Sequence, residues 1–216
     1  MASHNGHDYI EIAGNKWATM NVGANSITDF GLYFQWGDTT GYLSGSVGTT
    51  GTTYAKPYEW NDYKFNGGRK VNVLIETPNE SGLTKYNSGD SKTELEICDD
   101  AARAHWGGNW KIPSYNDYAA LSAATTAEWV IDYQGSGIRG TLLTDKNDST
   151  KKLFLPAAGN LWEGSHRNPN SAAHYFSSTK YVGVYALGTI IRPAKAIEIS
   201  AIWRYSGCPI RAIVGS

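Results

Sequence analysis

The sequence predicts an α+β fold, in which short strands precede and follow one helical segment. Three observations support this class. Residues 9–12 (YIEI) alternate like a half-buried strand, residues 99–124 contain two capped helical stretches, and most of the chain after residue 138 is strand-like. Short apolar runs bounded by Gly, Asn and Asp are typical of strands joined by turns. Because helices and strands are segregated along the chain, we expect the α+β class.

Two short helices follow from their capping residues. In the first, Asp99 or Asp100 caps the run 101–105 (AARAH), and two glycines end it. In the second, Ser114 is the N-cap, and Asp117 three residues later completes an acidic form of the capping box. One face of this second helix is expected on the core, because apolar residues recur there at close to helical spacing. These residues are Tyr118, Leu121 and Ala124.

The chain after the helices is predicted to be mainly β. Residues 138–143 and 152–155 flank a polar stretch and indicate a hairpin with a long loop. Residues 160–173 are polar and are predicted to be irregular. Residues 174–214 return to a strand-like pattern, with residues 181–185 (YVGVY) as a loop inside it.

Composition favours a globular protein that binds neither nucleic acid nor an anionic membrane. The 216 residues carry a formal net charge of −1, and 18% of them are charged. A chain that is close to neutral offers no bulk attraction to phosphate polymers. It contains no apolar run long enough to span a bilayer, and its first eight residues resemble neither a signal peptide nor a transit peptide.

The sequence predicts no cofactor, no metal and no catalytic residue. Cys98 and Cys208 lie far apart, which does not suit a zinc site; one bridge or two free thiols are both compatible, and we expect free thiols. His105, His166 and His174 are scattered along the chain, and no Gly-x-Ser-x-Gly nucleophile elbow is present. We therefore expect a binding protein without enzyme activity.

A series of Trp-, Gly- and Pro-containing motifs resembles a known family. The motifs occur in this order: residues 17–19 (WAT), 21–24 (NVGA), 34–39 (FQWGDT), 99–102 (DDAA), 106–113 (WGGNWKIP), 154–159 (FLPAAG) and 175–178 (YFSS), followed by Arg204, Gly207 and residues 210–213 (IRAI). Together they resemble the Fibrobacter succinogenes major domain family of Bacteroides-type bacteria and their phages. Phe176 departs from the pattern, since the family usually has Trp there.

This resemblance implies a C-type lectin-like fold of the subtype found in formylglycine-generating enzymes. Two short helices would pack on twisted, mainly antiparallel sheets, and the first and last strands would pair and bring the termini together. Residues 1–216 would form one such domain, with a loop-rich insertion at about 40–95. The common lectin disulfide joins the first helix to the last strand, so the resemblance also admits a Cys98–Cys208 bridge.

Some relatives with this fold are variable proteins of diversity-generating retroelements. Their C-terminal stretch is rewritten at template adenines, often in Asn codons. All fifteen Asn residues of this chain lie at or before Asn170, and the following 46 residues contain none. The low frequency of Asn in strands accounts for part of this gap. The pattern predicts a diversifiable ligand-binding face at about 171–210.

Large side chains with polar tips give this stretch the makeup of a binding surface. The candidate residues are Tyr181, Val182, Val184, Tyr185, Arg192, Ile202, Trp203, Tyr205 and Cys208. Adenine changes in an Asn codon can produce all of them except Trp203, which would be a fixed contact. The stretch is mildly basic, with Lys180, Arg192, Lys195, Arg204 and Arg211 against Glu198. Arg204 and Arg211 match the family motif and are expected to be structural.

The resemblance therefore implies a receptor-like or adhesin-like protein. Its partner would be a protein or a glycan on another cell, and its location would be extracellular, on the cell surface or on a virion. Two alternatives remain open: a fixed structural or adhesin component of the cell surface, and an enzyme of the formylglycine-generating type. The enzyme would require bound metal or a reactive cysteine.

Overall fold

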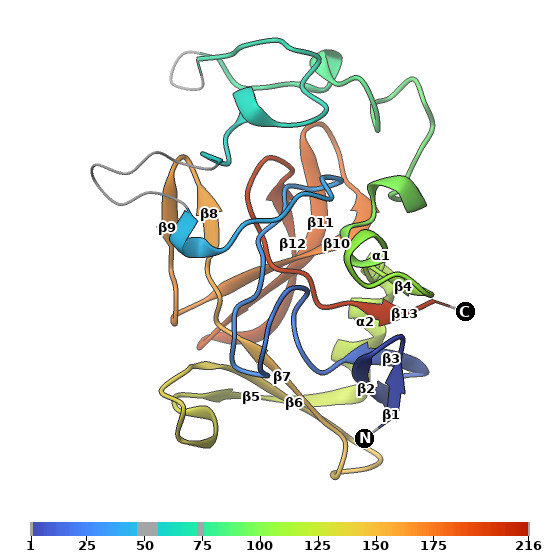
Figure 1. Ribbon diagram of the computed structural model, residues 1–216, viewed down its shortest axis with the longest axis vertical. Helices are drawn as coiled ribbons and strands as arrows, with labels where there is room; N and C mark the ends of the chain where they lie inside the picture. The colour runs from blue at the N-terminus through green and yellow to red at the C-terminus, as the bar shows by residue number, and fades with distance from the viewer. Residues whose placement is uncertain (1, 47–55, 73–75, 216) are drawn as a thin grey trace.

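Small antiparallel sheets, and not one continuous sheet, form the framework of the protein (Figure 1). The computed structural model describes residues 2–46, 56–72 and 76–215. Within these residues the strands are divided among four sheets. The sheet that contains both ends of the described chain has the order β1-β2-β3-β13-β4. Its strands are β1 (Ala2–His4), β2 (His7–Ile12), β3 (Asn15–Ala18), β13 (Ile213–Val214) and β4 (Trp110–Lys111).

The other three sheets contain the remaining strands. The central sheet comprises β10 (Ala173–Lys180), β11 (Tyr185–Arg192) and β12 (Lys195–Trp203), in that order. A second three-stranded sheet comprises β5 (Thr125–Val130), β6 (Gly140–Asp145) and β7 (Lys152–Pro156). The two-stranded sheet comprises β8 (Asn160–Trp162) and β9 (Ser165–Arg167).

Both predicted helices are confirmed, with the caps that the sequence indicates. In α1 (Ala101–Trp106) the Asp100 carboxylate accepts a hydrogen bond from the Arg103 backbone N–H at 3.0 Å. In α2 (Tyr115–Ala124) Ser114 and Asp117 form a reciprocal capping box. Short 3-10 turns lie at Ser44–Ser46, Trp60–Asp62, Glu80–Gly82, Ile97–Asp99 and Tyr133–Gly135. No helix of the described residues is long and apolar enough to cross a membrane.

The expected C-type lectin-like fold is wrong. Strands account for 35% of the residues and helices for 15%, and the strands are divided among several small sheets. The final strand β13 pairs with β3, with Ile213 opposite Trp17, and two strands, β2 and β3, separate it from β1. The coarser α+β class is compatible with this arrangement. The motifs of the sequence specify local packing, but the pairing of strands far apart in the chain depends on contacts that no motif encodes.

The β-hairpin predicted after the helices is confirmed as β6 and β7, with Leu142 opposite Phe154. The segment predicted to be irregular, residues 160–173, instead contains the hairpin β8–β9. Each of its strands has only three residues, which is too short to show an alternating pattern in sequence. This hairpin lies near β12 and helps to form the candidate site.

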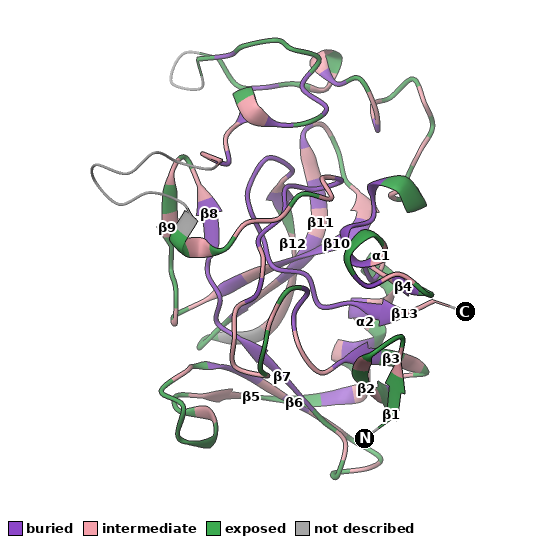
Figure 2. Ribbon diagram, viewed as in Figure 1, coloured by how far each residue is buried: buried purple, intermediate pink, exposed green. Residues whose placement is uncertain are grey.

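Three clusters of buried side chains make the core. Figure 2 marks the buried residues along the chain in purple. One packs α2 and the β5–β6–β7 sheet against the central sheet, through Tyr118, Leu143 and Tyr175. The second packs the loop-rich segment against the other side of the central sheet, through Trp36, Tyr86 and Ile202. The third surrounds α1, where Trp106 and Trp110 meet edge-to-face at 5.1 Å. Residues 47–55 and 73–75 of the expected insertion lie outside the described residues.

The central sheet requires glycine at position 188, on β11. A Cβ atom there would lie 2.4 Å from the Tyr175 carbonyl oxygen and 2.5 Å from Cδ1 of Ile202. The Ile202 side chain could rotate away, but the Tyr175 carbonyl is part of the backbone of the neighbouring strand and cannot move aside. Gly188 therefore lets β10 and β11 pair while Ile202 fills the core.

Gly188→Ala should lower the free energy of unfolding by about 1–3 kcal/mol, the usual cost of overpacking a close-packed interior. Urea denaturation measures this directly. Gly45→Ala is the matched control, because a Cβ at Gly45 meets nothing within 4 Å. Equal stability of the two variants would contradict the packing described for the central sheet.

Candidate functional site

Five of the nine residues predicted for the binding face reach the surface. Tyr181 and Val182 are exposed at 46% and 65% in the turn that joins β10 to β11. Arg192 is exposed at the other end of β11. Tyr185 and Trp203 are half-buried and lie directly opposite each other on β11 and β12, with ring centroids 4.1 Å apart.

The other four predicted residues are interior, so the prediction that they line a surface is wrong. The exposed fractions of Val184, Ile202, Tyr205 and Cys208 are 2%, 5%, 3% and 0%. All four belong to the cluster that includes Trp36. Successive residues of a strand point to opposite faces, so a strand packed on one side must bury part of any contiguous run of residues.

The exposed residues do not form one continuous face either. Tyr185 and Arg192 stand at opposite ends of β11, eight residues long, which places their Cα atoms roughly 24 Å apart. Arg192 pairs with Glu198 at 2.6 Å. The predicted basic character is reduced, because Arg204 and Arg211 are fully buried. Their burial agrees with the structural role expected for them.

Arg204 fixes the end of the central sheet where the exposed aromatic residues lie. Its guanidinium donates hydrogen bonds to three backbone carbonyls, those of Tyr86 at 2.9 Å, Tyr185 at 2.9 Å and Tyr181 at 3.2 Å. The group also lies 4.9 Å from the centre of the Trp36 ring. One buried side chain thus ties the turn that carries Tyr181 to the loop-rich segment and to the core.

A pocket of about 240 Å³ opens beside this end of the sheet, between the β8–β9 hairpin and β12. We call it the aromatic pocket. Its lining residues are Asn160, Trp162, Arg167, Asn168, His174, Ala201, Ile202, Trp203 and Ser206. Two indole rings and two amides therefore share a small concave site, the usual combination of apolar walls and a few polar groups in ligand pockets.

Two ring nitrogens of the aromatic pocket's residues are buried without a hydrogen bond of normal geometry, His174 Nδ1 and Trp162 Nε1. The Tyr205 hydroxyl is the protein group near the Trp162 indole. Burial, and secondarily the charge of Arg192, lower the pKa of His174 to about 4, so its imidazole is neutral at pH 7. A buried polar atom without a partner costs about 1–3 kcal/mol, which a ligand can recover.

Arg167 gives the aromatic pocket a fixed cationic edge. Its guanidinium lies 3.9 Å from the centre of the Trp162 ring, within the range of a cation–π contact. The same group is 3.6 Å from the Glu163 carboxylate. The pocket therefore carries no large surplus of positive charge, and the Arg167 guanidinium packs on the Trp162 ring.

Sequence analysis missed Trp162 and His174 as members of the site. The first lies on a strand of three residues, and the second at the start of β10, where the pattern predicts only a strand. A Trp inside a polar segment was the available signal, because a large aromatic residue in an otherwise polar stretch marks a contact.

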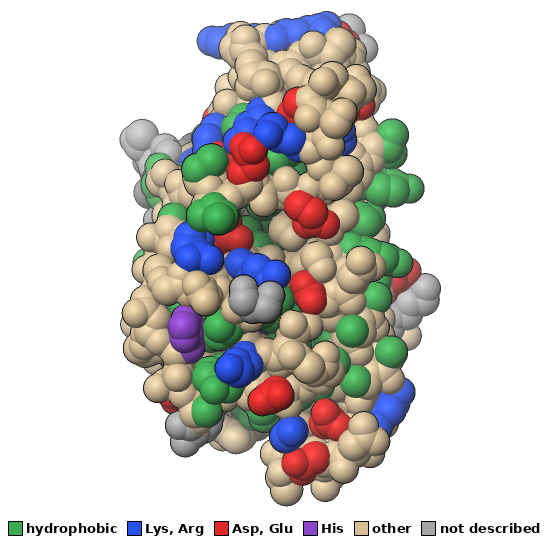
Figure 3. Space-filling view, turned by 90° about the vertical axis from the view of Figure 1, so that its right-hand side faces the viewer, with side chains coloured by type: hydrophobic (Ala, Val, Ile, Leu, Met, Phe, Trp, Pro, Cys, Tyr) green, Lys and Arg blue, Asp and Glu red, His purple; other side chains and the backbone are tan. Residues whose placement is uncertain are grey.

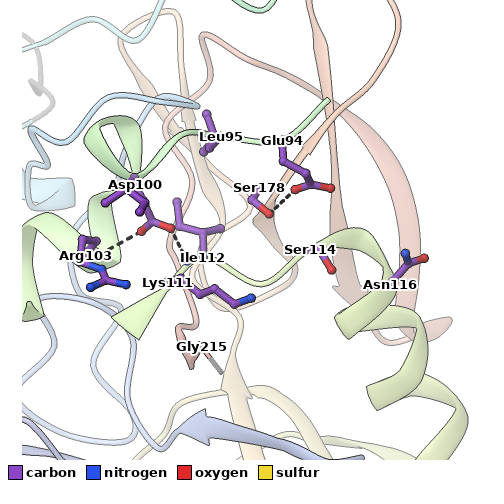
Figure 4. A pocket seen from close by; sticks show the side chains of 11 residues that line it. Glu94, Leu95, Asp100, Arg103, Lys111, Ile112, Ser114, Asn116, Ser178 and Gly215 are labelled. Carbon is purple, nitrogen blue, oxygen red and sulfur yellow. Dashed lines mark hydrogen bonds between the residues drawn. The ribbon is translucent and has the colours of Figure 1, made fainter. Parts of the chain in front are cut away.

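A second cavity, the charged cleft, has a volume of about 410 Å³ and lies between α1, α2 and β10 (Figure 4). Its carboxylates are engaged within the protein: Glu94 accepts from the Ser178 hydroxyl at 2.5 Å, and Asp100 accepts from the Ile112 N–H at 2.8 Å. Its lining includes Arg103 and Lys111 but no aromatic ring. On this side of the molecule acidic, basic and apolar side chains are interspersed (Figure 3). The aromatic pocket is therefore the better candidate site.

Among the described residues, Glu96, Cys98 and Asp99 stand close enough to share a metal ion. Lysine amines already pair with this group: Lys64 Nζ lies 2.6 Å from the Asp99 carboxylate, and Lys85 Nζ forms a second ion pair with it. We assign no metal to it. Both cysteines are free thiols, as expected: Cys98 is exposed and Cys208 is buried, so the bridge admitted by the resemblance is not formed.

Comparison with protein-family models finds no match to the chain. Searches of curated proteins and of solved structures also find no significant match. The family resemblance therefore remains a hypothesis from the sequence motifs, and the candidate site depends on its own geometry.

Protonation of His174 should make the stability of the protein pH-dependent. The folded pKa of about 4 lies below the unperturbed value of 6.5, so between these values the unfolded chain binds a proton that the folded chain does not. The free energy of unfolding should therefore fall as the pH drops through this window, by roughly 2 kcal/mol at pH 4.5. His174→Gln should lose this part of the pH dependence in urea denaturation at pH 7 and pH 4.5. Identical losses in parent and variant would contradict the burial of a neutral imidazole.

Proposed function

We propose that this protein is a receptor-like or adhesin-like binding protein that attaches to a partner on another cell. The binding surface is the end of the central sheet that carries Tyr181, Val182, Tyr185 and Trp203, together with the aromatic pocket beside it. This surface replaces the longer face predicted from the sequence, which included interior residues.

The observation that supports this proposal most strongly is the exposure of Tyr181 and Val182 next to an aromatic pair. Two adjacent large apolar side chains on an exposed turn are unfavourable in water unless a partner covers them. Behind them the rings of Tyr185 and Trp203 are in contact, and Trp203 lines the aromatic pocket. Aromatic residues clustered beside a concave site are typical of binding hot spots.

The way in which the turn is held also suits a surface whose side chains change. The Tyr181 N–H donates to the Tyr185 carbonyl at 3.1 Å, and the Tyr185 N–H donates to the Val182 carbonyl at 3.2 Å. Arg204 binds the carbonyls of Tyr181 and Tyr185. All of these contacts use backbone atoms, so the side chains at 181 and 182 can be replaced without loss of the frame.

Natural copies of the gene test whether the surface is diversified. We expect substitutions to concentrate at Tyr181, Val182 and Tyr185, whose side chains reach the surface. The buried positions Ile202 and Tyr205 should stay constant, because their replacement would disrupt the core. Sequencing several copies, with their genomic neighbourhood, gives the measurement. Variation spread evenly along the chain would favour a fixed adhesin or a structural component instead.

Binding to cells tests the surface directly. The double variant Tyr181→Ser, Val182→Ser should bind a panel of bacterial cells at least about 10-fold more weakly than the parent, because it removes the exposed contact residues. Flow cytometry with fluorescently labelled protein measures the apparent Kd. Ile131→Ser is the matched control, since Ile131 is 70% exposed and lies just after β5, a strand of another sheet. Equal losses in both variants, or no loss in either, would remove this surface from the proposal.

A further inference from the structure

The aromatic pocket has the size and the chemistry to select a class of ligand. At about 240 Å³ it is smaller than the roughly 300–1,000 Å³ of pockets for drug-sized molecules. It therefore suits a ligand of about one ring. Three separate segments build it, namely the β8–β9 hairpin, the start of β10 and the end of β12, so its shape depends on the folded core and not on a single loop.

The polar atoms in this region favour hydroxyl groups as ligand atoms. A neutral imidazole nitrogen donates or accepts according to its tautomer. A hydroxyl group both donates and accepts, so it can pair with His174 Nδ1 in either tautomer. Asn160 and Asn168 add amide groups to the same lining, and each amide offers both a donor and an acceptor.

The apolar part of the lining favours a ligand with an extended C–H surface. Trp162 and Trp203 both line the pocket, and each ring packs against a neighbour: Arg167 lies over Trp162, and the tilted Tyr185 ring contacts Trp203. Rings packed in this way give contact area at little cost in side-chain entropy. Because Glu163 pairs with Arg167, the charge of the site favours an uncharged ligand.

We propose that the aromatic pocket binds one uncharged pyranose residue of a glycan. Trp162 and Trp203 contact the C–H surface of the sugar ring. His174 and the two asparagines hydrogen-bond to its hydroxyl groups. This inference rests on the proposed binding function and names its ligand class: the sugar residue occupies the pocket, while the exposed turn at 181–182 contacts the rest of the partner.

Isothermal titration with five monosaccharides tests the inference: glucose, galactose, mannose, N-acetylglucosamine and N-acetylgalactosamine. We expect at least one to bind, and Trp203→Ala and His174→Ala to weaken that binding 10-fold or more. Trp203→Phe should recover part of the loss, because it restores an aromatic surface. Tyr115→Ala, an exposed residue on α2, is the control. Thermal melting of each variant confirms that it folds.

The possible results separate this inference from the proposed function. Binding of a sugar that the pocket variants do not weaken would overturn the assignment of the pocket. Binding of none of the five sugars, with cell attachment that still depends on Tyr181 and Val182, would overturn the sugar class and leave the proposed function standing. If the parent protein binds neither a sugar nor cells, both the sugar assignment and the proposed function are overturned.

Discussion

The guanidinium of Arg204 is the interaction on which the candidate site depends. It is fully buried and binds backbone carbonyls of two distant segments, the loop-rich segment through Tyr86 and the β10–β11 turn through Tyr181 and Tyr185. A buried charge is stable only when its donors are matched, and the planar, five-donor head of arginine matches several carbonyls at once. Removing these contacts would leave a buried charge or unpaired carbonyls, so these two segments and the one that carries Arg204 form a single unit.

This frame explains how the site can be both rigid and exposed. The turn at Tyr181 and Val182 is held by backbone hydrogen bonds and by Arg204, while its side chains project into solvent. The aromatic pocket is supported in a different way, because Arg167 packs over Trp162 and the Tyr185 ring packs against Trp203. A surface with preorganised contacts loses less entropy on binding than a mobile loop would, which suits a protein that recognises a partner.

The sequence predicts this structure well where information is local and poorly where it is not. The helix caps at Asp100 and Ser114 were predictable, since a cap is decided by residues within one turn. The burial of Ile202 and Tyr205 was not, because it depends on how β12 and the turn after it pack against the segment around Trp60. His174 joins the pocket only through tertiary contacts, so its role has no signature in the sequence.

Hydrogen exchange of an Arg204→Lys variant tests the central claim most directly. Lysine keeps the positive charge but lacks the planar fork that holds several carbonyls in fixed directions. The account predicts much faster exchange, by 10-fold or more, of the Tyr181 and Tyr185 amides and of the segment around Tyr86. It predicts little change in β6 and β7, because the hydrogen bonds and the ring contact of Arg204 go to other segments. Exchange at Tyr181, Tyr185 and Tyr86 equal to that of the parent would show that Arg204 does not hold the site together.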